Sequence, residues 1–418
     1  MSGVADPYGP GAGSGALSIA IAPTTILAGT ALLMLQFTTL VGTLAALVFL
    51  ICGCVLLVQR LGLTIAAVQA EIWFLALALW CLASVAWSPV PMSTLRFSIL
   101  LLFTFLVGMI LAYRLAPLSF LKAVFFSHLI AGLLSIAIGV DRSDGLGFLG
   151  IYGSKNAMAS MASIFVLAAL ALLLDRSLKK RQRLLAMLAL LLATVLLVRA
   201  QSLGALVTVT ATVIVMLILP FLRHAPALLR LLLGGLAVLA VGLASVVVFT
   251  NFDALAYWFV ETTGKDLTFT GRTDLWAVAF EEIAKRPLTG TGFQGFWVHG
   301  NPRAEELWEM FGIATRMGFH FHNVLISNAV ELGLPMALAQ VGFVLWASVV
   351  SIRWAIARPC AETLFFAGFM IRQIVLSLSE VTFFLQFDLP SIITVAIIVY
   401  ARRLTRSQQI WQDRPAQA

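Results

Sequence analysis

Hydrophobic residues run along this chain in long blocks that short polar segments separate. Blocks such as "ALLMLQFTTLVGTLAALVFLICGCVLLV" and "ALVTVTATVIVMLILPFL" contain no charged residue. A helix needs roughly 20 apolar residues to cross a hydrocarbon core of about 30 Å. The strands of a membrane β-barrel would instead alternate between apolar and polar positions. The pattern therefore predicts an integral membrane protein built from α-helices.

The apolar blocks predict about twelve transmembrane helices, and so an all-α polytopic membrane helix bundle. Composition agrees, since 61% of the 418 residues are hydrophobic, only 11% are charged and the mean hydropathy is +1.00. The predicted spans are 17–36, 38–58, 72–88, 96–113, 122–140, 157–174, 184–199, 203–222, 231–250, 322–352, 361–386 and 388–402.

Basic residues indicate how these helices are oriented. The net charge is +8, but in a membrane protein the placement of Lys and Arg matters more than their sum, and we expect no nucleic-acid partner. With twelve spans, every basic cluster falls on one side, and the positive-inside rule makes that side cytoplasmic. The clusters are Arg60, Arg114 with Lys122, "RSLKKRQR" at 176–183, Arg223 with Arg230, Arg353 with Arg358, and the arginines from 402 to 414.

This topology divides the chain into five parts. The first residues are rich in Gly, Pro and Ser and lack a basic n-region, so they predict a flexible tail and not a signal peptide. The expected parts are a cytoplasmic tail at 1–16, transmembrane helices one to nine at 17–250, one long periplasmic loop at 251–321, transmembrane helices ten to twelve at 322–402, and a second cytoplasmic tail at 403–418.

The long loop contains one amphipathic helix. In "GRTDLWAVAFEEIAKRP" the apolar residues recur at helical spacing, Thr270 or Thr273 can cap the helix, and Pro287 can end it. These apolar positions are Leu275, Trp276, Ala279, Phe280 and Ile283.

A glycine-rich segment, "LTGTGFQGFW", follows this helix. Its glycines permit tight turns and close approach of the backbone. Phe293, Phe296 and Trp297 could stack on a sugar ring or lie at the membrane surface as part of an aromatic belt. The belt is the commoner outcome for such residues.

A few polar residues lie at helix ends on the face opposite the basic clusters. Lys155 and Asn156 begin one predicted span, Arg199 ends another, and Arg272 opens the loop helix. Ionisable residues near the hydrocarbon are costly and therefore indicate function by default. Inside a span, Arg372 has a structural interpretation, since it could pair with Glu380 or Glu331 and hold helices together.

Two histidines, in "HFHNVLISNAVELG", precede the tenth span. His320 and His322 could form half of a metal site, but no Cys, Asp or Glu at helical ligand spacing completes it, so we expect no metal. Arg199, Arg272 and His322, with Lys155, remain. Fixed cations without metal ligands suit a lipid-linked diphosphate, and an imidazole can take a proton from a sugar hydroxyl near neutral pH.

Several of these segments together resemble one protein family. "GRTDLWAVAFEEIAKRPLTGTGFQGFW", followed by "HFHNVLISNAVELGLP", resembles the signature region of the O-antigen ligase and polysaccharide polymerase superfamily, including the exopolysaccharide polymerases of succinoglycan type. "LASVAWSPVPMSTLR", "YGSKNAMA" and "QSLGA" resemble earlier blocks of that family, in the same order. The resemblance touches residues 80–335.

The resemblance implies a GT-C-like bundle that acts as an inverting, metal-independent glycosyltransferase without a cofactor. It implies a multi-pass protein of the bacterial inner membrane whose periplasmic site uses a glycan on undecaprenyl diphosphate as donor. By motif, the essential residues would be Arg199, Arg272 and His322. The substrate-binding residues expected around them are Lys155, Asn156, Asn323, His320, Trp276 and Trp297.

Two enzymes of this kind differ in their acceptor. A polymerase extends another lipid-linked glycan, whereas an O-antigen ligase transfers to the lipid A core of lipopolysaccharide or to a protein. The "SVAWSPVP" block favours the exopolysaccharide polymerase. Other polysaccharide export proteins and the bilayer itself are the further partners that the resemblance implies.

Two readings outside this class stay open. Twelve spans with internal charges also fit a secondary transporter or flippase, although transporter sites lie near the membrane midplane and no inverted repeat is visible. A structural assembly subunit would need none of the three cationic residues individually.

Overall fold

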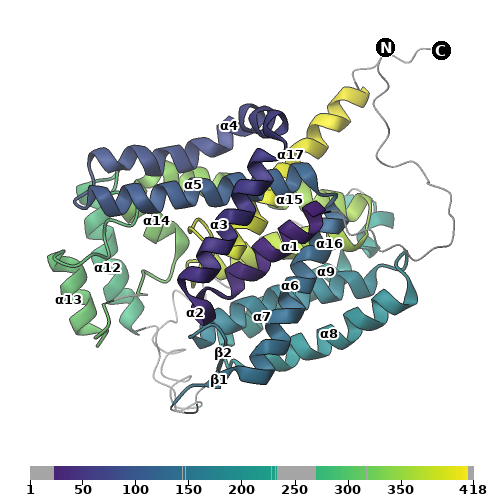
Figure 1. The fold of residues 1–418 in the computed structure, drawn as a ribbon, viewed down its shortest axis with the longest axis horizontal. Helices are drawn as coiled ribbons and strands as arrows, with labels where there is room; N and C mark the ends of the chain where they lie inside the picture. The colour runs from purple at the N-terminus through teal and green to yellow at the C-terminus, as the bar shows by residue number, and fades with distance from the viewer. Residues whose placement is uncertain are drawn as a thin grey trace.

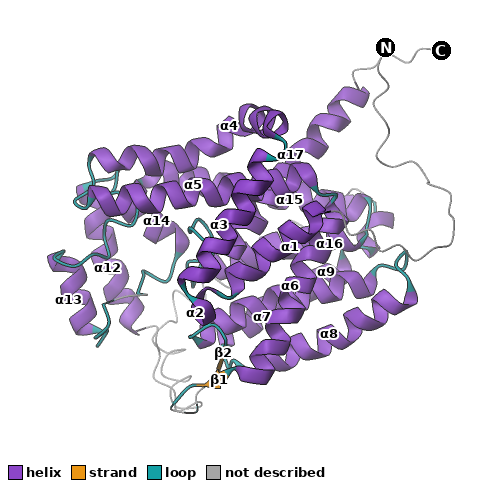
Figure 2. Ribbon diagram, viewed as in Figure 1, coloured by secondary structure: helices purple, strands orange, loops and turns teal. Residues whose placement is uncertain are grey.

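The computed structural model describes residues 23–143, 145, 147–226, 228–230, 232, 270–316 and 319–412, without the side chains of 270–273 and 407–412. The predicted tail at 1–16, the predicted span 231–250 apart from Leu232, and the first part of the predicted loop lie outside the described residues. The described part is almost entirely helical (Figure 2).

The helices follow one another with short connections. In the N-terminal half they are α1 (Pro23–Gln36), α2 (Thr38–Val41), α3 (Thr43–Val58), α4 (Leu61–Ala83), η1 (Ser84–Ala86), α5 (Pro91–Arg114), α6 (Pro117–Ile138), α7 (Lys155–Leu174), α8 (Lys180–Arg199), α9 (Leu203–Ile218) and η2 (Phe221–His224). In the C-terminal half they are α12 (Thr270–Lys285), α13 (Pro302–Met310), α14 (Val324–Leu332), α15 (Leu334–Ala357), α16 (Ala361–Ser377) and α17 (Leu389–Gln412). One small antiparallel pair, β1 (Val140–Asp141) with β2 (Phe148–Gly150), lies between α6 and α7.

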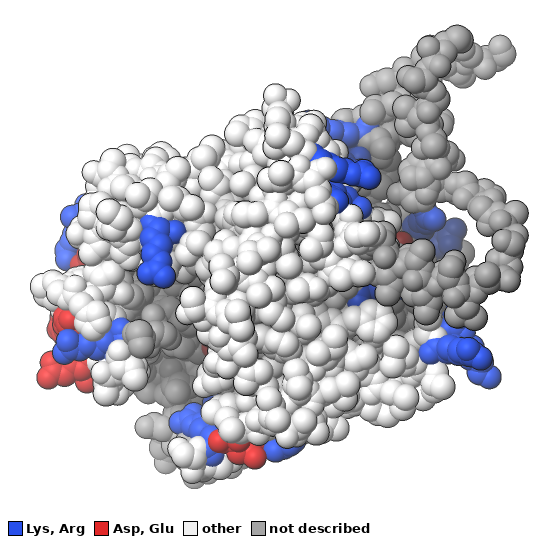
Figure 3. Space-filling view, viewed as in Figure 1, with Lys and Arg blue, Asp and Glu red and all other residues white. Residues whose placement is uncertain are grey.

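Seven helices within the described residues are long and apolar enough to cross a membrane. They are α4 with η1, α5, α6, α7, α8, α9 with η2, and α15, while α1 and α3 are shorter apolar helices. The face in Figure 3 has a broad uncharged middle, with charged side chains gathered toward its edges. The all-α multi-pass membrane architecture is therefore confirmed, and twelve spans remain a prediction.

Helix α7 lies at the centre of the lower layer in Figure 1 and packs against α6, α8, α9 and α16. It buries a run of small residues that includes Ala159, Ala162, Ala168 and Ala169. Helices pack closely in membranes where side chains are small, because dispersion contacts between close backbones drive association there. The N-terminus of α7 is thereby held in a fixed place.

The buried Arg372 joins α16 to α7. Its Nε donates to Ser163 Oγ (2.6 Å) and its Nη2 donates to the carbonyl and hydroxyl oxygens of Ser160 (2.9 and 2.6 Å). The predicted pairing of Arg372 with Glu380 or Glu331 is wrong. Because α16 packs on α7, the guanidinium meets the hydroxyls of that helix, while both carboxylates lie beyond its end.

The predicted span 322–352 is divided at Gly333 into α14 and α15. Gly333 has φ 84° and ψ 163°, a conformation open essentially only to glycine. A Cβ there would also collide with the carbonyl group of Leu288. A single helix is therefore wrong, since the glycine-rich segment crosses against the break.

The glycine-rich segment docks between α14 and the connection from α4 to α5. The backbone N–H groups of Thr291 and Gly292 donate to the carbonyls of Val330 and Glu331 (2.9 and 2.8 Å). A Cβ on Gly290 would strike the backbone of Glu331, and both Gly290 (φ 64°) and Gly292 (φ 98°) have positive φ. The predicted close backbone approach is confirmed.

The backbone of Phe293 ties this segment to α5 and its preceding turn. Its N–H donates to Ser84 Oγ (3.0 Å), and its carbonyl accepts from Thr94 Oγ1 (2.9 Å). The side chains of Phe293 and Phe296 are fully buried, and Trp297 packs in the same region against Phe321. An aromatic belt is therefore the wrong reading, because these rings form a core beneath the loop.

The predicted amphipathic helix is present as α12. Leu275 and Ala279 are buried, and Trp276 and Ile283 pack against the same small core. Phe280 departs from the prediction, because 57% of its surface is exposed. The apolar face is narrower than the sequence spacing indicates.

Asp175 links the turn after α7 to α16. Its Oδ1 accepts from the N–H and hydroxyl of Ser177 (2.9 and 2.7 Å), and its Oδ2 accepts from the N–H of Ala361 (2.9 Å). Burial alone would raise the pKa of Asp175, but these hydrogen bonds, with Arg183 nearby, outweigh burial and hold the pKa below its ordinary value.

Replacing Gly333 with Ala is expected to lower the free energy of unfolding by about 1–3 kcal/mol, since alanine cannot adopt this backbone conformation without strain. Thermal unfolding of the purified protein in detergent measures the change. Gly342→Ala, in the interior of α15 where an added Cβ meets nothing within 4 Å, is the matched control. Equal melting temperatures for the two variants would contradict the argument.

Replacing Asp175 with Asn is expected to cost about 1–3 kcal/mol at neutral pH, because three donors lose a charged acceptor. The folded pKa lies below the unfolded value near 3.8, so this stabilisation is complete above that pH and is lost as the pH falls through the folded pKa. Melting curves between pH 7 and pH 3 test the sign. The wild type should lose more stability on acidification than Asp175→Asn, and parallel losses would refute it.

Candidate functional site

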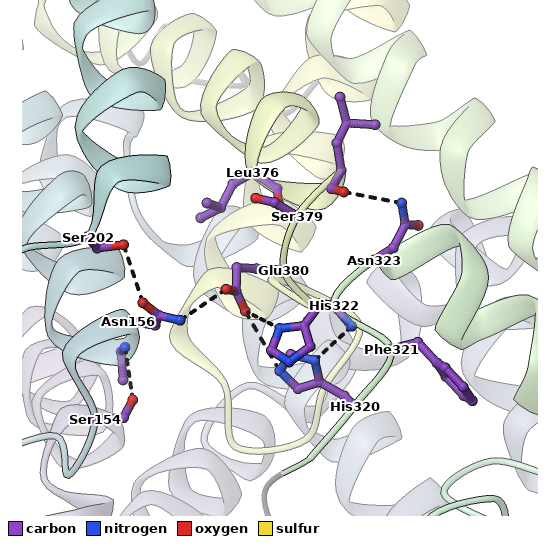
Figure 4. Close-up of polar contacts among 12 residues, drawn as sticks. Ser154, Asn156, Ser202, His320, Phe321, His322, Asn323, Leu376, Ser379 and Glu380 are labelled. Carbon is purple, nitrogen blue, oxygen red and sulfur yellow. Dashed lines mark hydrogen bonds and ion pairs between the residues drawn. The ribbon is translucent and has the colours of Figure 1, made fainter. Parts of the chain in front are cut away.

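Four separate elements meet in one polar cluster (Figure 4). They are the first turn of α7, the start of α9, the extended segment before α14, and the loop that follows α16. The cluster consists of Asn156, Ser202, His320, His322 and Glu380. Most of the predicted site residues lie in it or beside it.

Glu380 is at the centre of this cluster. One carboxylate oxygen, Oε2, lies 3.8 Å from His320 Nε2 and 3.5 Å from His322 Nδ1. The other oxygen, Oε1, accepts from Asn156 Nδ2 (3.1 Å), and Asn156 Oδ1 in turn accepts from Ser202 Oγ (3.3 Å). A chain of polar groups thus runs from the start of α9 to both imidazole rings.

The loop helix α12 holds the histidine segment from below. Trp276 Nε1 donates to the carbonyl of Phe321 (2.7 Å), and the Phe321 ring is fully buried between the two histidines in sequence. His322 itself has φ 51°, in the left-handed region. Non-glycine residues held in that region cost energy and cluster at functional sites.

Asn323 fixes the beginning of α14. Its Oδ1 accepts from the N–H of Ile326 (3.0 Å), which is an N-cap, and its Nδ2 donates to the carbonyl of Leu378 (3.3 Å). The expected role of Asn323, in fixing the turn or orienting a loop carbonyl, is confirmed. The same contact joins the histidine segment to the loop that carries Glu380.

Hydrogen bonds assign the protons on the two rings. His320 Nδ1 accepts from the backbone N–H of His322 (3.0 Å), so in its neutral form His320 carries its proton on Nε2, which faces Glu380. His322 Nδ1 is buried and also faces Glu380. A proton on Nδ1 suits that carboxylate and leaves Nε2 of His322 as a proton acceptor.

These three side chains could also be compared with a metal site. The ligand atoms of His320, His322 and Glu380 all lie within 4.8 Å of one another, which the search for an acid at helical spacing missed. A metal, however, needs the lone pair of His320 Nε2, and the hydrogen bond at Nδ1 places a proton there. The arrangement observed is two donors facing one carboxylate.

Arg199 and Lys155 flank the cluster at the end of α8. Arg199 Nη2 pairs with Asp141 Oδ1 (3.1 Å), and its guanidinium lies over the Phe148 ring, 4.1 Å from the centroid. A Cβ on Gly147 would meet both the Ala200 carbonyl and the Lys155 side chain. Lys155 therefore lies beside the end of α8, only one residue from Asn156.

The remaining predicted residues are placed as follows. The backbone of Arg272 lies in the first turn of α12, and its side chain is outside the described residues. Trp297 packs in the core beneath the loop, where its ring lies near Trp308, Phe319 and Phe321. Trp276 positions the histidine segment, as described above.

Glu380 and Ser202 were absent from the predicted site. Glu380 lies in what the sequence predicts to be a continuous span over 361–386, but α16 ends at Ser377. The signal that could have found it was an acidic residue in an apolar span, which indicates function by default. Ser202 lies in the "QSLGA" block, but the sequence gives it no partner.

Comparison with known proteins gives two matches. Residues 188–341 match the O-Antigen ligase family. The chain is also 29% identical, over 274 residues, to the Exopolysaccharide production protein ExoQ of Rhizobium meliloti (strain 1021). That similarity covers 63% of this chain and 61% of the relative.

The family match contains Arg199, Arg272 and the segment with both histidines, whereas Asn156 and Glu380 lie outside it. The functional cluster thus combines the matched region with parts of the chain on either side. The two matches and the motifs together support placing the chain in the O-antigen ligase and exopolysaccharide polymerase superfamily.

Proposed function

We propose that this protein is a membrane glycosyltransferase of cell-surface polysaccharide assembly. It transfers a glycan from undecaprenyl diphosphate to an acceptor sugar hydroxyl, at the periplasmic face of the bacterial inner membrane, with both termini cytoplasmic. The observation that carries the proposal is His322, strained in its backbone, with Nδ1 facing Glu380 at 3.5 Å. The family match and the similarity to an exopolysaccharide production protein support the substrate class.

The chemistry assigned to His322 is general base catalysis. Glu380 holds the Nδ1 proton, so Nε2 can take the proton of the acceptor hydroxyl as its oxygen attacks the anomeric carbon. The bond from that carbon to the diphosphate oxygen breaks, and attack from the opposite face inverts the configuration. Contacts between base and orienting carboxylate often shorten only when substrate binds, which fits the 3.5 Å separation.

Cationic residues then stabilise the leaving diphosphate. Arg199, Arg272 and Lys155 supply permanent positive charge where the negative charge grows, the work that a divalent metal does in other transferases. The ion pair of Arg199 with Asp141 is exposed, at 43% and 64% of the two side chains, and such pairs are weak enough to exchange for a phosphate. No metal is needed for this scheme.

The acceptor most consistent with the sequence is another lipid-linked glycan, which makes the protein a polymerase. The similarity to a protein of exopolysaccharide production supports this choice. The O-antigen ligase family match keeps transfer to lipid A core as the second candidate. A deletion strain separates the two: loss of all long chains indicates a polymerase, and long chains accumulating on undecaprenyl diphosphate indicate a ligase.

Replacing His322 with Ala is expected to lower the transfer rate by roughly 10²–10⁴-fold, because the base is lost. Glu380→Gln should lower kcat by about 10–100-fold, while KM for the donor stays near the wild-type value, since Glu380 positions the base. Rates are measured with purified protein in detergent and a lipid-linked donor.

His299 provides the matched control for these variants. It is exposed and lies 3.9 Å from Glu305, so His299→Ala removes an imidazole beside a carboxylate outside the cluster. Its activity should equal that of the wild type. A well-expressed His322→Ala protein with full activity would refute the assignment, and a Glu380→Gln effect confined to KM would remove the positioning role.

Replacing Arg199 or Arg272 with Ala is expected to lower transfer by about 10²–10³-fold each, the cost of removing one preorganised charge from a developing anion. Complementation of a deletion strain, followed by gels of surface and lipid-linked glycans, reports the result in cells. Arg303→Ala breaks exposed pairs with Glu281 and Glu306 and serves as the control. Unchanged glycan output from both test variants, at normal expression, would favour the transporter or scaffold readings.

A further inference from the structure

A groove of about 490 Å³ lies between α4 and α15, far from the candidate active site. Its volume falls in the range of roughly 300–1,000 Å³ that is typical of ligand pockets. The wall is aromatic and the base carries one arginine. The lining residues are Trp73, Ala339, Gly342, Phe343, Trp346 and Arg402.

The base of the groove is a buried polar group around Glu71. Its carboxylate accepts from Trp73 Nε1 (2.9 Å), from the Tyr113 hydroxyl (2.9 Å) and from Arg402 Nη1 (3.1 Å). The Arg402 guanidinium also lies 4.3 Å from the centroid of the Trp73 ring. The arginine is thus held rigidly at the base of the groove.

Positive charge exceeds negative charge at this base. Arg402, Arg403 and Arg406 all act on Glu71 electrostatically, so three cations surround one carboxylate. Arg403 contacts the Tyr113 ring at 4.7 Å and the Ala112 carbonyl, while Arg406 is exposed. The excess indicates an anionic ligand.

This base lies about one bilayer thickness from the histidine cluster. Thr94, near the start of α5, touches the glycine-rich segment, and Tyr113 is nineteen residues farther along, or roughly 28 Å at 1.5 Å per residue. Arg402 is likewise about 20 Å from the start of α17 by the same rise. Trp, Tyr and Arg at helix ends are typical of the headgroup level.

We propose that this groove binds an anionic glycerophospholipid from the leaflet opposite the candidate active site. One acyl chain would lie along Trp73, Phe343 and Trp346, and the headgroup phosphate would lie near Arg402 and Arg406. Charge complementarity favours this occupant, because basic groups between transmembrane helices on the cytoplasmic side suit anionic headgroups. A zwitterionic lipid would leave the excess charge unmatched.

The groove is distinct from the donor site proposed above. The donor diphosphate belongs with Arg199 and His322, whereas Arg402 marks the other end of the bundle. The lipid site therefore stands whether or not the transferase proposal does. Its occupant would be a resident lipid that fills the gap between α4 and α15.

Native mass spectrometry of the full chain in detergent tests the site. The probes are phosphatidylglycerol and phosphatidylcholine with the same acyl chains, titrated separately. The wild type is expected to retain one phosphatidylglycerol about tenfold more tightly than phosphatidylcholine, since each nearby basic residue favours anionic lipid. The preference should fall as ionic strength rises.

Gly342→Leu blocks the groove while leaving every charge in place. An added Cβ at Gly342 meets nothing within 4 Å, so the side chain can project into the groove. Phosphatidylglycerol retention should fall about fivefold or more, because the acyl chain is displaced. Gly62→Leu, on α4 and equally open, should retain the lipid as the wild type does.

Arg406→Gln is the second variant, because it removes one cation without exposing Glu71. It should lower the preference for phosphatidylglycerol several-fold, and Arg303→Gln, on α13, should not. Equal retention of the two lipids by the wild type would overturn the proposal, as would full retention by Gly342→Leu and Arg406→Gln. Stoichiometric displacement of phosphatidylglycerol by undecaprenyl phosphate would also overturn it, in favour of an isoprenoid occupant.

Discussion

Backbone hydrogen bonds between the glycine-rich segment and the end of α14 hold the rest of the site in position. Thr291 and Gly292 give their N–H groups to α14 carbonyls, and the N–H of Gln294 donates to the Glu331 carboxylate (2.9 Å). Irregular backbone near a membrane persists only where its polar groups find partners. Because α14 is fixed at this end, Asn323 and His322 at its other end are fixed as well.

The candidate site illustrates a division of labour between helices and loops. The helix ends of α7 and α9 supply Asn156 and Ser202, and their packed core makes these positions rigid. The reactive groups, His322 and Glu380, come from irregular segments that two contacts lock together. Function carried on loops over a rigid scaffold is a common arrangement, and here the scaffold is the bundle.

Sequence patterns predicted the membrane class, most helices and most of the residues at one face. Uninterrupted apolar runs were sufficient for α5 to α9, because hydrocarbon leaves helices as the natural solution for such segments. The break at Gly333 escaped prediction, since α14 and α15 are both apolar and only the tertiary approach of Leu288 requires the glycine. The burial of Phe293 and Phe296 was missed for the same reason, because their partners come from distant segments.

Glu380 was mispredicted for a different physical reason. A carboxylate in an apolar stretch indicates either a helix-holding ion pair or a site, and nothing local decides between them. The partners of Glu380 are 58 and 60 residues earlier in the chain for His322 and His320, and more distant still for Asn156. Long-range pairing of this kind is not encoded in spacing along one helix.

The ion pair between Arg199 and Asp141 has a consequence for turnover. If Arg199 receives the diphosphate, Asp141 is an internal anion that competes for the same guanidinium. Such a competitor weakens the hold on the spent undecaprenyl diphosphate as much as on the incoming donor, and it restores the arginine to a defined position after each cycle. The β1–β2 hairpin, which carries Asp141 and the Phe148 ring beneath the guanidinium, would then serve as a resting place for the charge between reactions.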